Sequence, residues 1–184
     1  MEPNSQESLE IAAETLPPEV SMFPIALKAG AIFAGVDIAV RIFAWALDAP
    51  GGGVEQIVSL LALLGAALTG QILYKRQGLP PIGYGEALGV GILSVLVMAL
   101  ITMVYGFIHF NVIDPEFTTR ALAAAEQAVS GLDLSEEEVE TALTMQKIML
   151  NPMILPVVAL FGTLIRGIII ALITAIFTRK SGQS

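Results

Sequence analysis

Cysteine is absent from this 184-residue chain, and histidine and tryptophan occur once each. Without cysteine there are no disulfides, no thiolate metal sites and no thiol nucleophile. Charged residues make up only 14% of the sequence, whereas soluble domains carry about 25%. The nine Lys and Arg residues are outnumbered by 17 acids, so nothing resembles a basic surface for nucleic acid.

Apolar residues dominate instead: 55% of the chain is hydrophobic and its mean hydropathy is +0.77. Four apolar runs are long enough to cross a hydrocarbon core of about 30 Å, which takes about 20 helical residues. The runs cover residues 22–47, 54–74, 84–110 and 152–178. In lipid such runs must be helices, because a helix satisfies its own backbone hydrogen bonds. We therefore expect an all-α integral membrane four-helix bundle.

The segments outside these runs divide into an N-terminal tail and one long connection. Residues 1–21 are acidic and contain three prolines, which predicts a disordered tail before the membrane domain at 22–180. Between spans three and four, residues 114–150 predict an extramembrane helical hairpin packed on the outer face of the bundle. Asp114-Pro115 should begin its first helix, about 115–129, and Ser135 with Glu138 forms a capping box for the second.

Lys and Arg residues near the span ends predict the orientation. Lys75, Arg76, Arg179 and Lys180 fall on the side that holds both termini, whereas the other side has only Arg120 and Lys147. The positive-inside rule then places both termini in the cytoplasm, with the chain in a bacterial inner membrane.

Three long stretches resemble a bacterial membrane family of unknown function, DUF 4199. They are IGYGEALGVGILSVLVMALITMVYGFIHFNVIDPEF at 82–117, GLDLSEEEVETALTMQKIM at 131–149, and the final span with its basic end. Tyr84-Gly85-Glu86-Ala87 and the turn at 113–117 are the most specific pieces. The resemblance covers most of residues 22–180. It implies the architecture and the membrane location, and it implies no catalytic residues or cofactor.

Three charges lie deep within the spans: Asp37 and Arg41 on the first, and Arg166 on the last. Asp37 and Arg41 are four residues apart and so share one helix face. Charges in a span normally face the bundle interior and pair there. Because Asp37 and Arg166 have similar depths, we predict that they meet near the midplane. This intramembrane polar cluster either fixes helix orientation, forms an ion relay or polar substrate site, or contacts another subunit.

Other polar residues lie near the membrane interfaces. Lys28 and Glu86 are both about one turn inside the cytoplasmic side, where a pair between them or separate anchoring is expected. His109 and Asp114 mark the outer interface, and a lone histidine favours hydrogen bonding over metal binding.

Small residues at four-residue spacing, such as Ala26, Gly30 and Ala34, predict close helix packing inside the bundle or, alternatively, a homodimer. No metal-ligand cluster and no HExxH or GxSxG motif is present, so we expect neither a metal site, a cofactor nor an enzyme.

The leading functional hypothesis is a structural or accessory subunit, or an assembly factor, of a membrane complex. A small transporter or channel using the intramembrane charges is the alternative, and a membrane-embedded lipid-modifying enzyme is the second. Expected partners are the lipid bilayer and other membrane proteins or a second copy.

Overall fold

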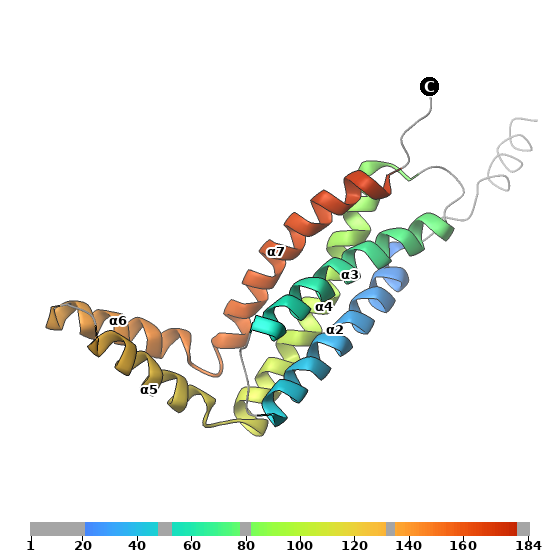
Figure 1. Ribbon diagram of the computed structural model, residues 1–184. Helices are drawn as coiled ribbons and strands as arrows, with labels where there is room; N and C mark the ends of the chain where they lie inside the picture. The colour runs from blue at the N-terminus through green and yellow to red at the C-terminus, as the bar shows by residue number, and fades with distance from the viewer. Residues whose placement is uncertain (1–20, 48–52, 78–81, 132–134, 180–184) are drawn as a thin grey trace, which may run out of the picture.

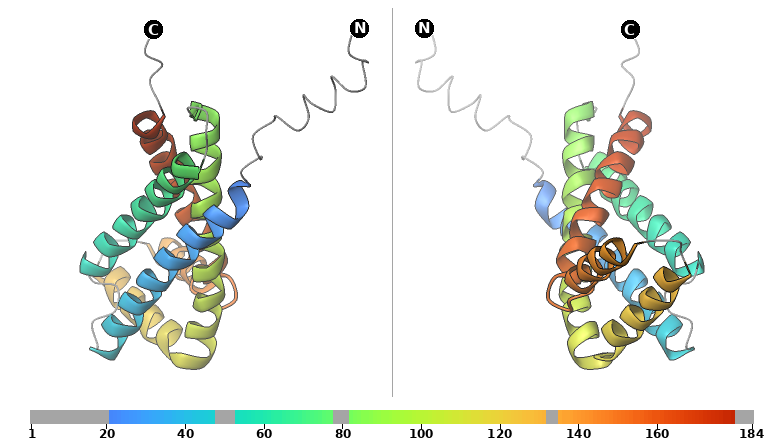
Figure 2. Two further views of the ribbon diagram at one scale, coloured as in Figure 1. Left: turned by 90° about the vertical axis from the view of Figure 1, so that its right-hand side faces the viewer. Right: turned by 90° about the vertical axis from the view of Figure 1, so that its left-hand side faces the viewer.

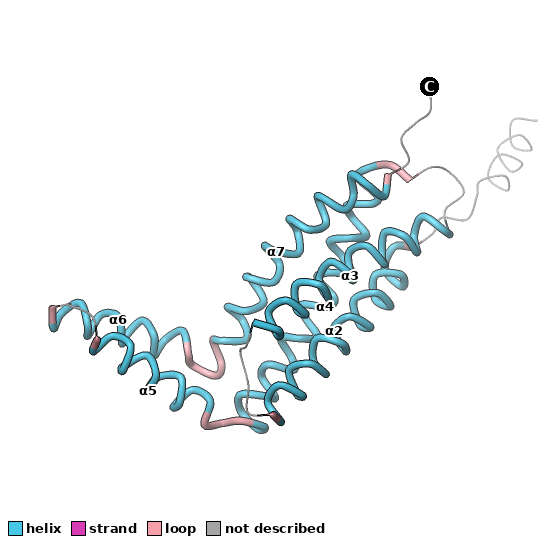
Figure 3. Tube along the Cα trace, in the orientation of Figure 1, coloured by secondary structure: helices cyan, strands magenta, loops and turns pink. Residues whose placement is uncertain are grey.

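The computed structural model describes residues 21–47, 53–77, 82–131 and 135–179, and every regular element among them is helical (Figure 3). The predicted acidic tail lies outside the described residues. Four helices are long and apolar enough to cross a membrane: α2 (Met22–Ala46), α3 (Gly53–Gln77), α4 (Tyr84–Ile108) and α7 (Leu155–Thr178). A π-helical turn, His109–Ile113, extends α4. The predictions of an all-helical chain and of four apolar spans are confirmed for this part of the chain.

The four long helices run alternately up and down, so that α2 begins and α7 ends at the same end of the bundle (Figures 1 and 2). We call this the termini end. Helices α3 and α4 each pack on both α2 and α7 and therefore lie between them. The first and last spans are thus on opposite sides of the bundle.

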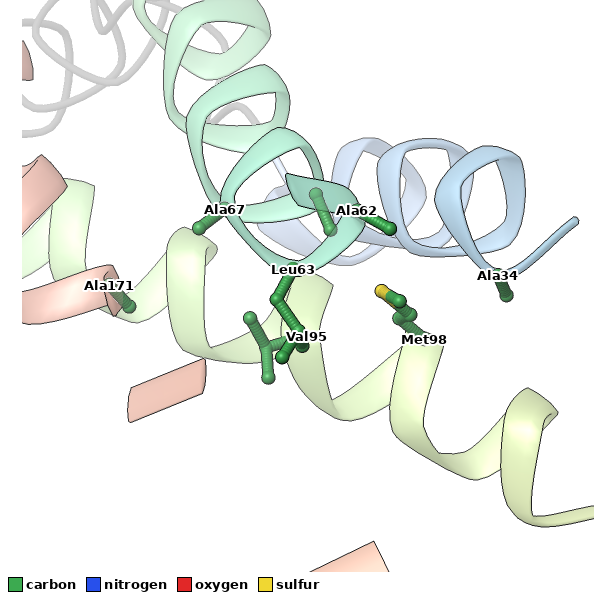
Figure 4. Packing of buried hydrophobic residues seen from close by; sticks show 8 residues of the cluster. Ala34, Ala62, Leu63, Ala67, Val95, Met98 and Ala171 are labelled. Atoms are coloured by element: carbon green, nitrogen blue, oxygen red, sulfur yellow. The ribbon is translucent and has the colours of Figure 1, made fainter. Parts of the chain in front are cut away.

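The core between these helices is built largely from alanine. Residues at the centre come from all four spans: Ala34, Ala62, Leu63, Ala66, Ala67, Val95, Met98 and Ala171 (Figure 4). Such small side chains let the helix backbones approach closely, which is how helices gain packing energy in lipid, where burial from water is not available. The predicted small-residue positions Ala26, Gly30 and Ala34 are buried, which supports internal packing.

The outward faces of the long helices carry large apolar side chains. Examples that are more than half exposed occur on every span, among them Ile32, Phe43, Leu61, Val104, Phe161 and Phe177. Soluble proteins rarely expose contiguous apolar surface on this scale. The distribution fits helices surrounded by hydrocarbon.

The connection between α4 and α7 contains two shorter helices, α5 (Phe117–Ser130) and α6 (Glu136–Met149), which contact each other. We call them the outer pair. The sequence predicted that these helices pack on the outer face of the bundle. Instead, the outer pair projects sideways from the end opposite the termini (Figures 1 and 2). Its direction is set at Asp114 and at Asn151, where short turns join it to the spans.

Of the two caps predicted for the outer pair, the one at α5 does not form and the one at α6 does. Helix α5 begins at Phe117, and the carboxylate of Asp114 accepts a hydrogen bond from Arg120 Nη2 at 2.6 Å instead of capping the helix. At α6 the predicted capping box is confirmed: Ser135 Oγ accepts from Glu138 N, and Glu138 Oε2 accepts from Ser135 N at 2.9 Å. The hydrogen bonds from the Ser135 backbone and hydroxyl lower the pKa of Glu138, so the cap depends on an ionised carboxylate.

Candidate functional site

Charged side chains of the first two spans gather between α2 and α3, in the half of the bundle nearer the outer pair. Arg41 Nε donates to Asp37 Oδ2 at 2.8 Å, as their spacing on one helix face predicts. Arg41 Nη1 donates to Glu55 Oε1, and Nη2 to Ser59 Oγ, each at 3.1 Å. The Ser59 hydroxyl in turn donates to Asp37 Oδ1. One guanidinium is therefore shared by two carboxylates and a hydroxyl.

These four residues, Asp37, Arg41, Glu55 and Ser59, form what we call the polar cluster. The Asp37 side chain is only 3% exposed, whereas that of Arg41 is 40% exposed. With one cation and two carboxylates, the cluster has a formal charge of −1 when all groups are ionised. Asp37 lies nine residues before the end of α2, which is about 14 Å at 1.5 Å per residue. The cluster thus extends from the membrane end to well inside the bundle.

Glu55 and Ser59 were missed by the sequence interpretation, although a signal was present. They are four residues apart at the start of α3, directly after the Pro-Gly-Gly-Gly segment at 50–53. Only six residues separate the end of α2 at Ala46 from the start of α3 at Gly53, and the two helices pack on each other, so the first turns of α3 lie beside the last turns of α2. The second carboxylate bound to Arg41 therefore comes from the next span.

The predicted contact between Asp37 and Arg166 does not form. Arg166 is exposed on α7, and its Nε donates to the carbonyl of Gly162 in its own helix at 3.1 Å. The reason is the order of the helices, since α3 and α4 separate α7 from α2. Equal depth in two spans does not make them neighbours.

Lys28 and Glu86 are both exposed, and no ion pair joins them in the part of the chain that the structure describes. Glu86 Oε2 instead accepts the backbone N–H of Gly83 at 2.9 Å, at the start of α4. Glu86 therefore stabilises the beginning of its own helix, where a carboxylate is favoured.

His109 lies in the π-helical turn that ends the third span. Its Nδ1 is 3.0 Å from the hydroxyl of Tyr105, and its ring lies 5.3 Å from the rings of Tyr105 and Phe110. The ring of Trp45, from the end of α2, meets it edge-on at 6.3 Å. Asp114, the other predicted interface residue, is buried and paired with Arg120.

A cavity of about 320 Å³ opens beside the polar cluster, and residues of all four spans and of α5 line it. Arg41, Glu55, Tyr105 and His109 form its polar wall. Its other walls are apolar and include Trp45, Met103, Phe117, Pro156 and Leu160. The cavity is large enough for a small ligand and combines a charged wall with apolar ones.

Over the described ranges, no three His, Cys, Asp or Glu side chains are grouped so that they could hold a metal ion. The hydroxyl of Thr102 on the cavity wall donates to carbonyls of its own helix, at 3.1 Å from Met98 O and from Ala99 O. The site can hold a polar group in an apolar surrounding, and no activated nucleophile is apparent among these residues.

Comparison with known families places these residues within a family match. The profile of the family described as "Protein of unknown function (DUF4199)" matches residues 28–180. This range includes all of the polar cluster, the cavity wall and the outer pair. No curated protein and no solved structure matches the chain significantly.

Proposed function

We propose that this chain, which belongs to the DUF4199 family of proteins of unknown function, is a non-catalytic accessory subunit or assembly factor of a larger membrane complex. The observation that carries the proposal is the outer pair. An extramembrane helical pair held away from its own bundle presents its surface to something other than its own spans (Figure 1).

The exposed surface of the outer pair is apolar where α6 approaches the bundle. Met145, Ile148 and Met149 are all more than half exposed, and Met153 follows in the turn to α7. Methionine-rich surfaces adapt to partners because the side chain is unbranched and flexible. These residues are the ones that we expect a partner protein to cover.

The other half of α6 is acidic: its first turn contains Glu136, Glu137 and Glu138, and Glu140 follows. An amphipathic helix that binds a bilayer surface usually carries Lys and Arg on its polar face, because membranes carry negative charge. The acidic half therefore favours a protein partner over a lipid surface for the outer pair.

The predicted orientation also belongs to this proposal. Lys75 and Arg76 are in the last turn of α3, and Arg179 ends α7, all at the termini end. In a bacterial inner membrane this end would face the cytoplasm. The outer pair and its partner would then lie on the opposite side.

Introducing charge on the apolar surface of α6 is expected to release the partner. For the double substitution Met145→Glu and Ile148→Glu, we expect co-purifying protein to fall about tenfold, which corresponds to about 1.4 kcal/mol of binding free energy. The measurement is affinity purification in mild detergent after cross-linking, with the recovered proteins quantified by mass spectrometry.

The matched control is Thr141→Glu, which adds an acid at another exposed position of α6. It should leave the recovery of partners unchanged. If the unmodified chain is recovered alone from native membranes, the proposed function is wrong. If the double variant and the control recover equal amounts of partner protein, the apolar surface of the outer pair is not part of the interface.

A small transporter is a second candidate, favoured by the cavity beside the polar cluster. The packing of the half of the bundle toward the termini argues against a transporter. A packed apolar cluster that includes Ile25, Tyr74 and Val90 fills this half. Fully buried Gln71 also joins α3 to α7 there, accepting a hydrogen bond from Thr178 and donating to Ala171 O. Transport would require this half to open. A flux into liposomes that Asp37→Asn leaves unchanged would end this candidate.

A further inference from the structure

Arg166 occupies the middle of α7. It is the twelfth of the 24 residues of the helix, so at 1.5 Å per residue it lies about 17–18 Å from either end. Its side chain is exposed and does not line the cavity. A permanently charged group thus projects from the bundle at the depth where hydrocarbon surrounds the other spans.

Such a position is costly for an isolated chain. On insertion scales, an arginine at the centre of a span costs about 2.5–3.5 kcal/mol of insertion free energy, and simulations give a higher cost. The hydrogen bond to Gly162 O uses one of the five N–H groups of the guanidinium. The other four need acceptors, and hydrocarbon supplies none.

The chain itself offers no carboxylate to Arg166 within the described spans. Asp37 and Glu55 are both bound to Arg41, between α2 and α3. Glu86 lies in the first turn of α4, at the termini end, and is bound to Gly83. Every acid of the described spans is therefore either paired with another cation or distant in depth.

The described spans of a second copy would not supply the missing group. Symmetric pairing through α7 would bring one Arg166 toward the other and add repulsion. A copy docking with a different face would offer the same acids, with the same partners and depths. The complementary carboxylate must come from a different protein.

The surface around Arg166 suits a packed helix. One turn toward the outer pair, a methyl group added at Gly162 would meet no atom within 4 Å, so another backbone can approach closely there. Ile165, Ile169 and Ile173 are exposed on the same helix and provide apolar contact on both sides of the charge. Among the four candidate spans, α7 is also the one least buried by its own chain.

The outer pair lies on the same side of the bundle as α7. In Figure 1 it projects on the side where α7 forms the edge, and in the right-hand view of Figure 2 both face the viewer. A helix packed on α7 would therefore end close to the outer pair. The two surfaces together can bind one membrane protein.

We infer that α7 binds a transmembrane helix of a different protein, and that this helix carries an aspartate or glutamate near its midpoint, which accepts hydrogen bonds from Arg166. The inference rests on the proposed accessory function and names the chemistry of the partner. A guanidinium and a carboxylate that are both shielded from water form a bidentate, charge-assisted pair. Each charged group is costly in lipid when it is unpaired. The ion pair therefore stabilises the complex and also favours a partner helix that carries a carboxylate over one that does not.

The test uses the full chain in phosphatidylcholine vesicles at pH 8 and a synthetic probe, a 24-residue Leu/Ala transmembrane peptide with one central Glu. Energy transfer between labelled chain and labelled peptide reports association. We expect the Glu peptide to associate at least tenfold more strongly than the same peptide with Gln. Arg166→Leu should abolish this preference, and Arg166→Glu should transfer it to a peptide with a central Lys.

Lys28→Leu is the matched control, because Lys28 is an exposed cation near a membrane end and should not select the probe. Equal association of the Glu and Gln peptides with the native chain would overturn the inference. So would self-association of the chain that requires Arg166. If the Glu peptide is selected while native purification recovers only the isolated chain, the accessory function fails and this inference stands. If native partners depend on the outer pair but the chain shows no preference for the Glu peptide, the accessory function stands and this inference fails.

Discussion

Replacing Gly30 by alanine is expected to destabilise the bundle by about 1–3 kcal/mol, the usual cost of adding a methyl group to a packed core. A Cβ at this position would lie 2.5 Å from the backbone oxygen of Ser94 and 2.7 Å from Cβ of Val97. Neither atom is the end of a flexible side chain, so α2 and α4 would have to move apart. The absence of a side chain at Gly30 therefore allows α2 and α4 to pack this closely.

Gly35 provides the matched control for this prediction on the same helix. A methyl group there meets no atom within 4 Å. Gly35→Ala should therefore be neutral or slightly stabilising, since alanine is the better helix former by about 1 kcal/mol. Unfolding in mixed micelles, followed by loss of helical circular dichroism, measures both variants. Equal stability of the two would show that the close contact between α2 and α4 does not limit packing.

Replacing Arg41 by methionine is expected to have the largest effect on the polar cluster, about 3 kcal/mol, at the low end for a broken buried ion pair because Arg41 is partly exposed. The substitution leaves the Asp37 carboxylate, which is 3% exposed, with Ser59 as the remaining partner described for it. Glu55 loses its guanidinium partner at the same time. The cost comes from the charges left behind more than from the contact removed.

A second substitution tests that explanation. Adding Asp37→Leu to Arg41→Met removes the buried charge as well, and replacing a buried ion pair by apolar residues is often nearly neutral. The double variant should therefore recover much of the lost stability in the same unfolding assay. If the double variant is as unstable as the sum of its two single variants, Asp37 and Arg41 do not act as a pair.

The sequence by itself determined the elements of this protein. Spans of about 20 residues separated by Pro-Gly and Pro-Pro segments predicted four helices, because lipid leaves no other way to satisfy the backbone. The Ser135 and Glu138 spacing predicted the start of α6, and the i, i+4 spacing placed Asp37 and Arg41 on one helix face, where they form an ion pair. These features are local, so each depends on residues only a few positions apart.

Only the tertiary structure decided which spans are neighbours and therefore which charges meet. Similar depth suggested that Arg166 would reach Asp37, but α3 and α4 lie between their helices, and Glu55 and Ser59 complete the cluster instead. Asp114 was expected to cap α5, but α5 begins later, at Phe117, and the Asp114 carboxylate accepts a hydrogen bond from the guanidinium of Arg120. Depth along a span follows from counting residues, whereas position around the bundle depends on how all four helices pack. For that reason the sequence could place Arg166 at mid-membrane but could not show that it faces outward.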